Sequence, residues 1–331
     1  MKFRLKIVSI DELAITRRRV GRNFTYRDAA GNRVIDPETK ARIRSLAIPP
    51  AYTDVRIAAD ERAHIQAVGH DEAGRRQYRY HPEWTAIRED RKAARLLDLL
   101  SVLPRIRAAV ARDLASRRLD RSKAIACAVA LIDQTHIRVG CDAYARENGS
   151  HGAATLLKRH VTVNGSRIFL RFRGKAGKMI TCAVQDPTIA RAMRRMGMLP
   201  GNRMLQFLDG AGNRRPISAS EINAYLRRVS GRAVTAKDFR MLGASAWAVE
   251  HLAALTPGTS ETGRKRQIAA VMRDVAEHLA NTPAVVRKSY VPALVVQSFE
   301  DGTLSKAFRR ARAGMHRNRT ETVLGLLGRR P

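Results

Sequence analysis

The amino-acid sequence predicts an α+β fold, in which a small N-terminal antiparallel β domain precedes a larger, mainly α-helical domain. Short runs of alternating polar and apolar residues, separated by polar turns, fill the first 90 residues. From Arg91 onwards the apolar residues recur with a helical period instead. Strand-like runs return at residues 160–185, which predicts a three-stranded β island within the helical domain. The predicted domains therefore comprise residues 1–90 and 91–331.

The N-terminal domain is expected to contain a hairpin and three further strands. The segment FTYRDAAGNRVI is typical of a hairpin that turns at Asp28–Gly31. The three alternating runs that follow are Asp54–Ala58, Ala63–Gly69 and Arg76–Tyr80. Two other stretches are compatible with short helices, and these are Ser9–Ile15 and Pro37–Leu46.

Proline, glycine and capping signals bound the helices of the second domain. Pro104 is expected to end the helix RKAARLLDLLSVL and to open the next one, because proline lacks the N–H that a helix interior needs but suits a first turn. The apolar segment SKAIACAVALIDQTHIRV predicts another helix. Two later helices begin at capping signals, which are Ser218 with Glu221 and Thr235 with Asp238, and Gly231 ends the first of them.

The β island is expected to turn twice. Asn164–Gly165 is a typical two-residue hairpin turn, and a basic turn around Lys175 leads into the third strand. Helices resume at PTIARAMRRM. A later helix places one apolar stripe on its surface, namely Ile268, Val271, Met272, Val275 and Leu279, which we interpret as core. The tail from Ser305 is expected to be basic and mostly helical.

Charge is the dominant feature of the composition. The chain of 331 residues has 62 Lys and Arg against 30 Asp and Glu, a net charge of +32. Self-repulsion of this size opposes a compact fold, so a large polyanion is the expected partner, and nucleic acid is the first candidate. A membrane surface is disfavoured, because the sequence has no transmembrane run, lipidation motif or basic helix with a bulky apolar face.

Cysteine usage predicts an intracellular, reducing location. Cys127, Cys141 and Cys182 occur singly, without a CxxC pair, and the N-terminal residues are too charged for a signal peptide. The histidines are dispersed, so no metal site is expected. The segment RGKAGKM lacks the glycine and the Ser or Thr of a phosphate loop, so the use of ATP is not expected either.

Four segments of the second domain place a cation, an amide or a phenol near a turn or a helix end. They are LIDQTHIRVG with Arg138, FRGKAGK with Lys175, TAKDFR with Arg240, and NTPAVVRKSY with Asn281 and Tyr290. Transfer of a DNA phosphodiester needs these residue types: arginine forks for the non-bridging oxygens, a lysine of lowered pKa beside them as acid, an amide donor and a phenol nucleophile.

Each of these residues also has an ordinary structural explanation. Arg138 could cap the preceding helix, and Lys175 could simply occupy a turn. Arg240 could extend past a core-facing turn to solvent, Asn281 could mark a helix start, and Tyr290 could bury its ring and hydrogen-bond its hydroxyl. Taken one at a time, the motifs do not decide between structure and catalysis.

As an ordered set, the segments resemble the type IB DNA topoisomerases of the poxviral and bacterial branch. The resemblance extends to the N-terminal domain through IPPAYTDVRI and HIQAVGHDEAGRRQYRYHPEW, and to LIDQTHIRVGCDAYARENGSHGAATLLKRHV in the second. It implies a C-shaped clamp of a DNA-binding domain and a catalytic domain around double-stranded DNA. It further implies a cytoplasmic, nucleoid-associated monomer without a small-molecule substrate. Such an enzyme relaxes supercoils of either sign without ATP or metal, by cutting one strand, letting it rotate and resealing it.

The resemblance also assigns roles to residues. Tyr290 would attack the phosphodiester and hold a 3′-phosphotyrosyl bond, Arg138 and Arg240 would clamp the non-bridging oxygens, and Lys175 would protonate the 5′-oxygen. Asn281 stands where poxviral enzymes carry histidine, which suggests a hydrogen-bond donor without a proton-shuttling role. DNA contacts are implied for Gln77, Tyr78, Tyr80, Tyr144 and Lys237. Tyr78 and Tyr80 lie two apart on one strand, so packing against each other is an equally good explanation for them.

Three positions depart from the family pattern, and two other functions remain open. The departures are Met241, Ala176 and Pro292. A tyrosine recombinase would share the catalytic chemistry, but recombinases typically carry His-x-x-Arg where this chain has Lys237-x-x-Arg240, and they lack this N-terminal β domain. The second alternative is a DNA-binding relative that keeps the fold without the activity.

Overall fold

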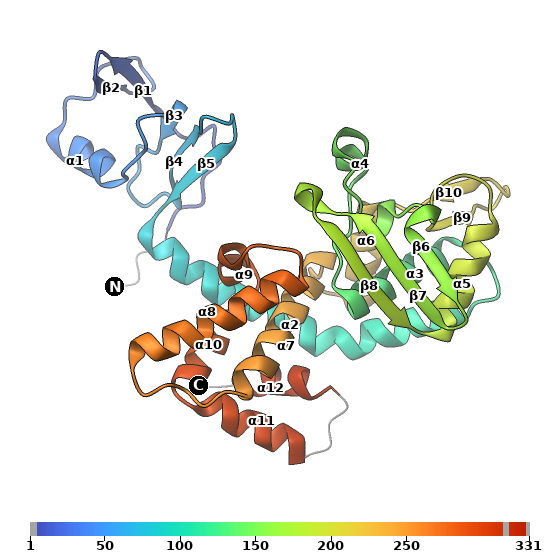
Figure 1. Ribbon diagram of the computed structural model, residues 1–331. Helices are drawn as coiled ribbons and strands as arrows, with labels where there is room; N and C mark the ends of the chain where they lie inside the picture. Colours follow the sequence, from blue (N-terminus) through green and yellow to red (C-terminus); the bar gives the residue numbers. More distant parts are fainter. Residues whose placement is uncertain (1–4, 314–317, 329–331) are drawn as a thin grey trace. The chain divides into compact units, whose positions relative to one another are not determined.

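The computed structural model describes residues 5–313 and 318–328, and it confirms the predicted α+β class (Figure 1). The chain divides into two compact units, Met1–Arg91 and Lys92–Pro331. An antiparallel sheet dominates the first unit, and helices with small sheets make up the second.

The first unit is built on a five-stranded antiparallel sheet in the order β2-β1-β3-β4-β5. Its strands are β1 (Ile15–Val20), β2 (Asn23–Arg27), β3 (Thr53–Ile57), β4 (Ile65–His70) and β5 (Arg76–Tyr80). β3, β4 and β5 confirm the three alternating runs predicted from the sequence. Helix α1 (Pro37–Ser45) confirms the second short helix, and the Asp36 side chain caps it by accepting from Thr39 N at 2.7 Å.

The start of this unit differs from the prediction. Ser9–Ile15 is not helical, and Ile15 instead opens β1, where it pairs with Ile57 and is buried against it. The hairpin of the sheet turns at Gly21, which has φ +58°, so β1 and β2 are paired there. Asp28–Gly31 does form a turn, but only an isolated bridge between Arg27 and Arg33 follows it. The helix prediction failed because Ile15 joins a strand, β1, that pairs with β3 far along the chain. Such a long-range pairing has no signature in the local sequence.

Helices form most of the second unit. They are α2 (Pro82–Ala115), which begins in the first unit, α3 (Arg121–Thr135), α4 (Asp142–Asn148), α5 (Pro187–Met198), α6 (Ala219–Ser230), α7 (Ala236–Ala253), α8 (Glu261–His278), α9 (Pro283–Ser289), α10 (Ala293–Glu300), α11 (Thr303–Ala313) and α12 (Arg319–Gly328). α3 lies at the centre, and every residue from Lys123 to Ile132 is buried. The five apolar residues predicted for one stripe of the later helix are all buried as well.

Pro104 does not end a helix, contrary to the prediction. α2 runs through it, from Pro82 to Ala115. Leu99 and Leu103 before the proline and Ile106 after it are all buried in the same core. Burial of one continuous apolar face therefore outweighs the hydrogen bond that the proline ring removes.

The predicted β island is confirmed. β6 (Val161–Asn164), β7 (Arg167–Arg173) and β8 (Met179–Gln185) form an antiparallel sheet, with Gly165 at φ +56° in the first turn. Alternate residues of β7, namely Ile168, Leu170 and Phe172, face the core, where α3 and α5 pack (Figure 1). The capping signals at Ser218 and Thr235 also lie at the helix starts where they were predicted.

Helices α4 and α10 and one small sheet were not predicted. α4 contains no buried residue, so its sequence has no apolar period to detect. The two-stranded sheet of β9 (Gln206–Leu208) and β10 (Arg214–Pro216) is formed by short strands. In the basic tail, α11 and α12 are helical as expected, and residues 314–317 and 329–331 lie outside the described part of the chain.

Candidate active site

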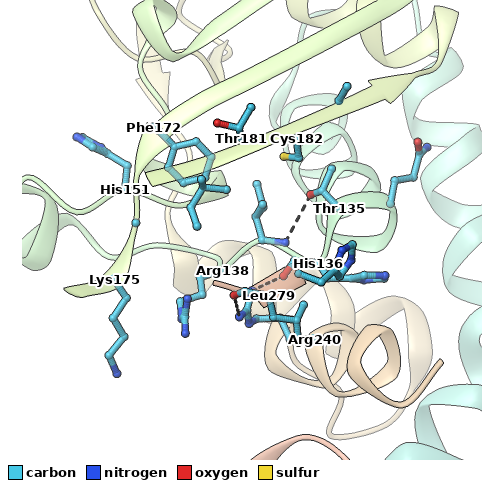
Figure 2. Close-up of a pocket in the computed structure, with 16 residues that line it drawn as sticks. Thr135, His136, Arg138, His151, Phe172, Lys175, Thr181, Cys182, Arg240 and Leu279 are labelled. Carbon is cyan, nitrogen blue, oxygen red and sulfur yellow. Dashed lines mark hydrogen bonds between the residues drawn. The ribbon is translucent and has the colours of Figure 1, made fainter. Parts of the chain in front are cut away.

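Three of the five residues assigned to catalysis line one cavity of the second unit. This cavity has a volume of about 320 Å³ and is bounded by Arg138, Lys175 and Arg240 together with the end of α3, β8 and the end of α8. Figure 2 shows the ends of Arg138 and Arg240 close together, with Lys175 extending from its turn on the same side of the cavity. Tyr290 and Asn281 adjoin this group, because Arg240 lies over the Tyr290 ring at 5.5 Å from its centroid.

The Arg240 side chain hydrogen-bonds two loops of the site. It lies on the second turn of α7 and is 5% exposed, so it does not extend to solvent. Its Nη1 donates to the carbonyl of His136 after α3, and its Nη2 donates to the carbonyl of Leu279 after α8 at 3.0 Å (Figure 2). Its Nε is buried without a hydrogen-bond partner. Burial first, and then the charge of Arg138, lower the pKa of this guanidinium, but an arginine stays protonated.

The loop that carries Arg138 is a tight backbone structure. α3 ends at Thr135, and His136 takes the left-handed C-cap position with φ +54°. His136, and not Arg138, therefore caps this helix. The Arg138 carbonyl accepts from Ala153 N at 2.8 Å, and this brings Gly152 against the loop. The contact fixes the backbone from which the half-buried Arg138 side chain projects.

Replacing Gly152 with alanine is expected to displace the Arg138 loop. A Cβ atom at this position would lie 2.4 Å from the Arg138 carbonyl oxygen and 2.5 Å from Gly140 N, both backbone atoms that cannot rotate away. We expect the free energy of unfolding to fall by about 3 kcal/mol, as measured by urea denaturation, and cleavage to slow. Gly210→Ala is the control, because nothing lies within 4 Å of a Cβ there. Equal stability of the two variants would contradict this close packing.

His136 contributes to the site in a way that the sequence did not indicate. Its ring packs so closely on α7 that a Cβ at Gly243 would lie 2.2 Å from it. Burial is the main cause that lowers its pKa to about 4, and Arg240 is among the cations that add to this. His136 is therefore neutral at pH 7. Its carbonyl accepts a hydrogen bond from Arg240, and its neutral ring fills space near the arginine without adding charge.

Lys175 lies at the tip of the β7–β8 hairpin. The turn Lys175–Gly177 is a short 3₁₀ segment closed by Gly174 N donating to Lys178 O at 2.7 Å. Ala176, one of the departures from the family pattern, has φ +58° and so occupies a left-handed position. The Lys175 side chain is exposed. The burial beside the arginines that was expected for Lys175 is therefore not present in the DNA-free protein.

Tyr290 closes helix α9 and is held there by several backbone contacts. It is the C-cap residue, with its N–H donating to Val286 O at 3.0 Å, and it is 8% exposed. Its carbonyl accepts from Ser245 Oγ at 3.3 Å. Buried Lys92 donates to the carbonyls of Arg287 and Lys288, at 3.2 and 3.4 Å, and so neutralises the end of the helix.

Asn281 lies immediately before α9. Its N–H donates to Ala276 O at 2.7 Å, and Thr282 then caps the helix that ends at Tyr290. The side-chain Nδ2 of Asn281 is buried near Tyr290, and among the described residues it makes no hydrogen bond of ordinary geometry. The Arg240 Nε is in the same condition. Two buried donors beside the tyrosine are thus available to an oxygen acceptor.

The surroundings of Tyr290 favour its phenolate. Burial opposes ionisation and is the largest single influence, but the interactions with Arg240, Arg138 and Asn281 outweigh it and lower the pKa of the phenol below its ordinary value of 10.0. A lowered pKa increases the fraction of phenolate, which is the nucleophilic form.

We expect this shift to be visible in a spectrophotometric titration. The chain has seven tyrosines, and subtracting the tyrosinate absorbance curve of Tyr290→Phe from that of the wild type isolates one phenol. Its midpoint should lie below pH 10.0, because the cations stabilise the deprotonated form. Tyr225→Phe is the comparison, since burial first and then the Asp113 carboxylate raise the pKa of Tyr225. A Tyr290 midpoint above pH 10.0 would contradict an activated phenol.

The five residues assigned to DNA contacts lie in both units. In the second, Tyr144 on α4 is 62% exposed, and Lys237 is exposed on the first turn of α7. In the first, Gln77 donates to Asp71 Oδ2 at 2.9 Å, so part of its side chain is already engaged.

Tyr78 and Tyr80 stack on one face of β5, with ring centroids 5.8 Å apart. Tyr80 also stacks on Trp84 at 6.4 Å and packs on the core, whereas Tyr78 is 37% exposed. Tyr80 thus packs between two aromatic rings while remaining partly exposed, and Tyr78 has the more exposed ring of the two tyrosines.

The described residues lack two other kinds of feature. Within residues 5–313 and 318–328, no three His, Cys, Asp or Glu side chains are close enough to hold a metal ion. No helix in the described ranges is both long and apolar enough to span a bilayer.

Comparison with known proteins places this chain in a family. A family model described as the catalytic core of eukaryotic DNA topoisomerase I matches residues 83–311. A second, described as the N-terminal domain of bacterial DNA topoisomerase IB, matches residues 23–71. DNA topoisomerase 1B of Acanthamoeba polyphaga mimivirus is 30% identical over 294 residues, which cover 87% of this chain and 88% of the relative. DNA topoisomerase 1B of Vaccinia virus (strain Copenhagen) is 21% identical over 271 residues, covering 78% and 81%.

The match to the catalytic core spans more than half of the chain, and the relatives match along most of their own length. The chain therefore belongs to the type IB DNA topoisomerases and is an enzyme of that class. The resemblance inferred from the motifs is confirmed.

Proposed function

We propose that this enzyme relaxes supercoiled double-stranded DNA by transient cleavage of one strand through a covalent bond to Tyr290. The observation that carries the proposal is the gathering of a buried phenol with two arginines that lower its pKa. Unpaired buried donors of Arg240 and Asn281 lie beside it. Preorganised donors of this kind stabilise charge that develops on phosphoryl oxygens.

In the forward step, Tyr290 attacks the phosphorus as the phenolate, the form that its surroundings favour, and forms a 3′-phosphotyrosyl ester. Arg138 and Arg240 bind the non-bridging oxygens, whose charge is concentrated in the pentacovalent transition state. The bond to the 5′-oxygen breaks, and this oxygen takes a proton from Lys175. DNA bound over the exposed Lys175 would exclude water from it, so that its proton passes to the leaving oxygen.

The reverse step regenerates the DNA. The 5′-hydroxyl attacks the phosphotyrosyl phosphorus, Tyr290 leaves as phenolate, and the proton returns to Lys175. One phosphoester bond is exchanged for another in each direction, so neither ATP nor a metal ion is required. Between the two steps the cut strand can rotate about its partner, which relaxes supercoils of either sign.

We further propose that the enzyme acts as a monomer and that both units contact the duplex, as a clamp. The net charge of +32 supports an extended contact with phosphates. Such contacts release counterions, so log K should fall by about 0.9 per unit of log salt for each phosphate neutralised.

Relaxation of supercoiled plasmid in EDTA without ATP tests this function. The wild-type protein should relax any supercoiled plasmid, of either sign, at protein concentrations where it is monomeric. A tyrosine recombinase would instead require specific paired sites, and the family matches already disfavour it. Binding without relaxation would support the second alternative, a relative that keeps the fold but lacks the activity.

A further inference from the structure

A second lysine at the β7–β8 turn hydrogen-bonds the segment that leads to Tyr290. Lys178 follows Lys175 by three residues on the same turn, and its Nζ donates to the backbone carbonyl of Asn281 at 2.7 Å. Both partners lie within the second unit. The contact thus joins the hairpin of the candidate acid to the segment immediately before α9.

The other contacts within the site show what this one adds. Arg240 joins the loop after α3 to the loop after α8, and Ser245 and Lys92 hold the end of α9. The hairpin is also held on its β7 side, where the strand enters the turn, because His151 N donates to Arg173 O at 2.8 Å. Lys178 makes the contact on the β8 side of the same turn. It uses a backbone carbonyl as acceptor, and this carbonyl belongs to a residue whose side chain contributes to the lowered pKa of Tyr290.

The geometry points to Lys178 as a positioning residue for strand cleavage: its bond to the Asn281 carbonyl keeps Lys175 directed at the oxygen that leaves when Tyr290 attacks. This inference rests on the proposed roles of Lys175 and Tyr290. Proton transfer requires the acid within hydrogen-bond reach of the leaving oxygen. Lys175 is exposed, and its turn contains two residues in left-handed conformation, Ala176 and Gly177. A turn fixed by Lys178 therefore holds Lys175 in fewer orientations, and more of them allow the proton transfer.

The distance along the chain from this contact to the nucleophile is short. Asn281 is followed by Thr282, the N-cap of α9, and α9 ends at Tyr290. A hairpin tied to this point therefore has a fixed relation to the phosphorus that Tyr290 attacks. Without the bond, the β8 side of the turn loses its contact with the segment before α9, and a displacement of about 1 Å can cost a factor of about 10² in rate.

The test compares two DNA substrates under single-turnover conditions and saturating enzyme. One has the natural 5′-oxygen, and the other has a bridging 5′-sulfur, which leaves as a thiolate and needs no proton. Lys178→Met should cleave the natural substrate about 10- to 100-fold more slowly, and it should cleave the sulfur substrate at nearly the wild-type rate. Lys178→Arg should recover part of the loss, because a guanidinium can also donate to the Asn281 carbonyl.

Lys306→Met is the matched control, since it removes the same charge from an exposed position on α11. If Lys178→Met and Lys306→Met behave alike on both substrates, Lys178 is an ordinary surface charge and the inference is wrong. If Lys178→Met slows both substrates equally, it acts on DNA binding or on Tyr290, which also overturns a role through Lys175. Lys175→Ala tests the proposed function separately: a defect that the sulfur substrate does not relieve would show that Lys175 is not the acid.

Discussion

Tyr290→Phe is expected to bind supercoiled plasmid without nicking or relaxing it. The change removes one oxygen and keeps the ring that packs beneath Arg240, so the fold and the cationic surface should persist. Loss of a covalent nucleophile commonly lowers the reaction rate by more than about four orders of magnitude. Relaxation assays and denaturant trapping of the covalent protein–DNA complex measure both consequences.

The control for this variant is Tyr52→Phe, which removes a hydroxyl from a half-buried ring of the first unit. It should relax and trap DNA like the wild type. A covalent complex formed by Tyr290→Phe would identify a different nucleophile, and the assignment of Tyr290 would then fail. Loss of plasmid binding by the same variant would indicate that the tyrosine supports the fold instead.

The second large effect is expected for Arg240→Lys, although the charge is conserved. One ammonium group cannot reach the His136 and Leu279 carbonyls and also bind a phosphate oxygen, whereas the guanidinium has separate donors for each. We expect cleavage to slow by about 10²- to 10³-fold. The free energy of unfolding should fall by about 2 kcal/mol, because at least one buried carbonyl loses its partner.

Single-turnover cleavage and urea denaturation, run on the same preparations, separate the two losses. Arg266→Lys is the control, at an exposed position of α8. Unchanged stability of Arg240→Lys would mean that the two carbonyl contacts do not support the fold. Unchanged cleavage would contradict the proposed role of Arg240 at the phosphate.

Local patterns were sufficient to predict most of the fold. In strands with one buried face, such as β7, buried and exposed residues alternate strictly. In helices with one apolar stripe, such as α8, apolar residues recur with the helical period. The errors arose where tertiary contacts overrode local rules. Pro104 continues a helix because its neighbours are buried on both sides, and β1 exists because Ile15 pairs with a strand about 40 residues away. α4 buries nothing, so no period marks it.

The sequence was sufficient to select candidate residues by type, but it did not indicate how they are held. The chemistry of phosphoryl transfer and the order of the motifs selected the five candidate residues. Their fixation depends instead on the backbone carbonyls of His136, Leu279 and Asn281. Every residue has a carbonyl, so such contacts leave no signature in the sequence. The same holds for His136, whose left-handed conformation is unusual for a residue other than glycine.

The order of the five candidate residues along the chain has a consequence for synthesis. Arg138, Lys175 and Arg240 precede Asn281, and Tyr290 comes last. A ribosome makes the chain from its N-terminus at about 5–20 residues per second. A nascent or prematurely terminated chain can therefore already carry the cationic groups that attract DNA, while it still lacks the only proposed group that could become attached to it. With the proposed chemistry, a chain interrupted before Tyr290 could not leave a break in the genome.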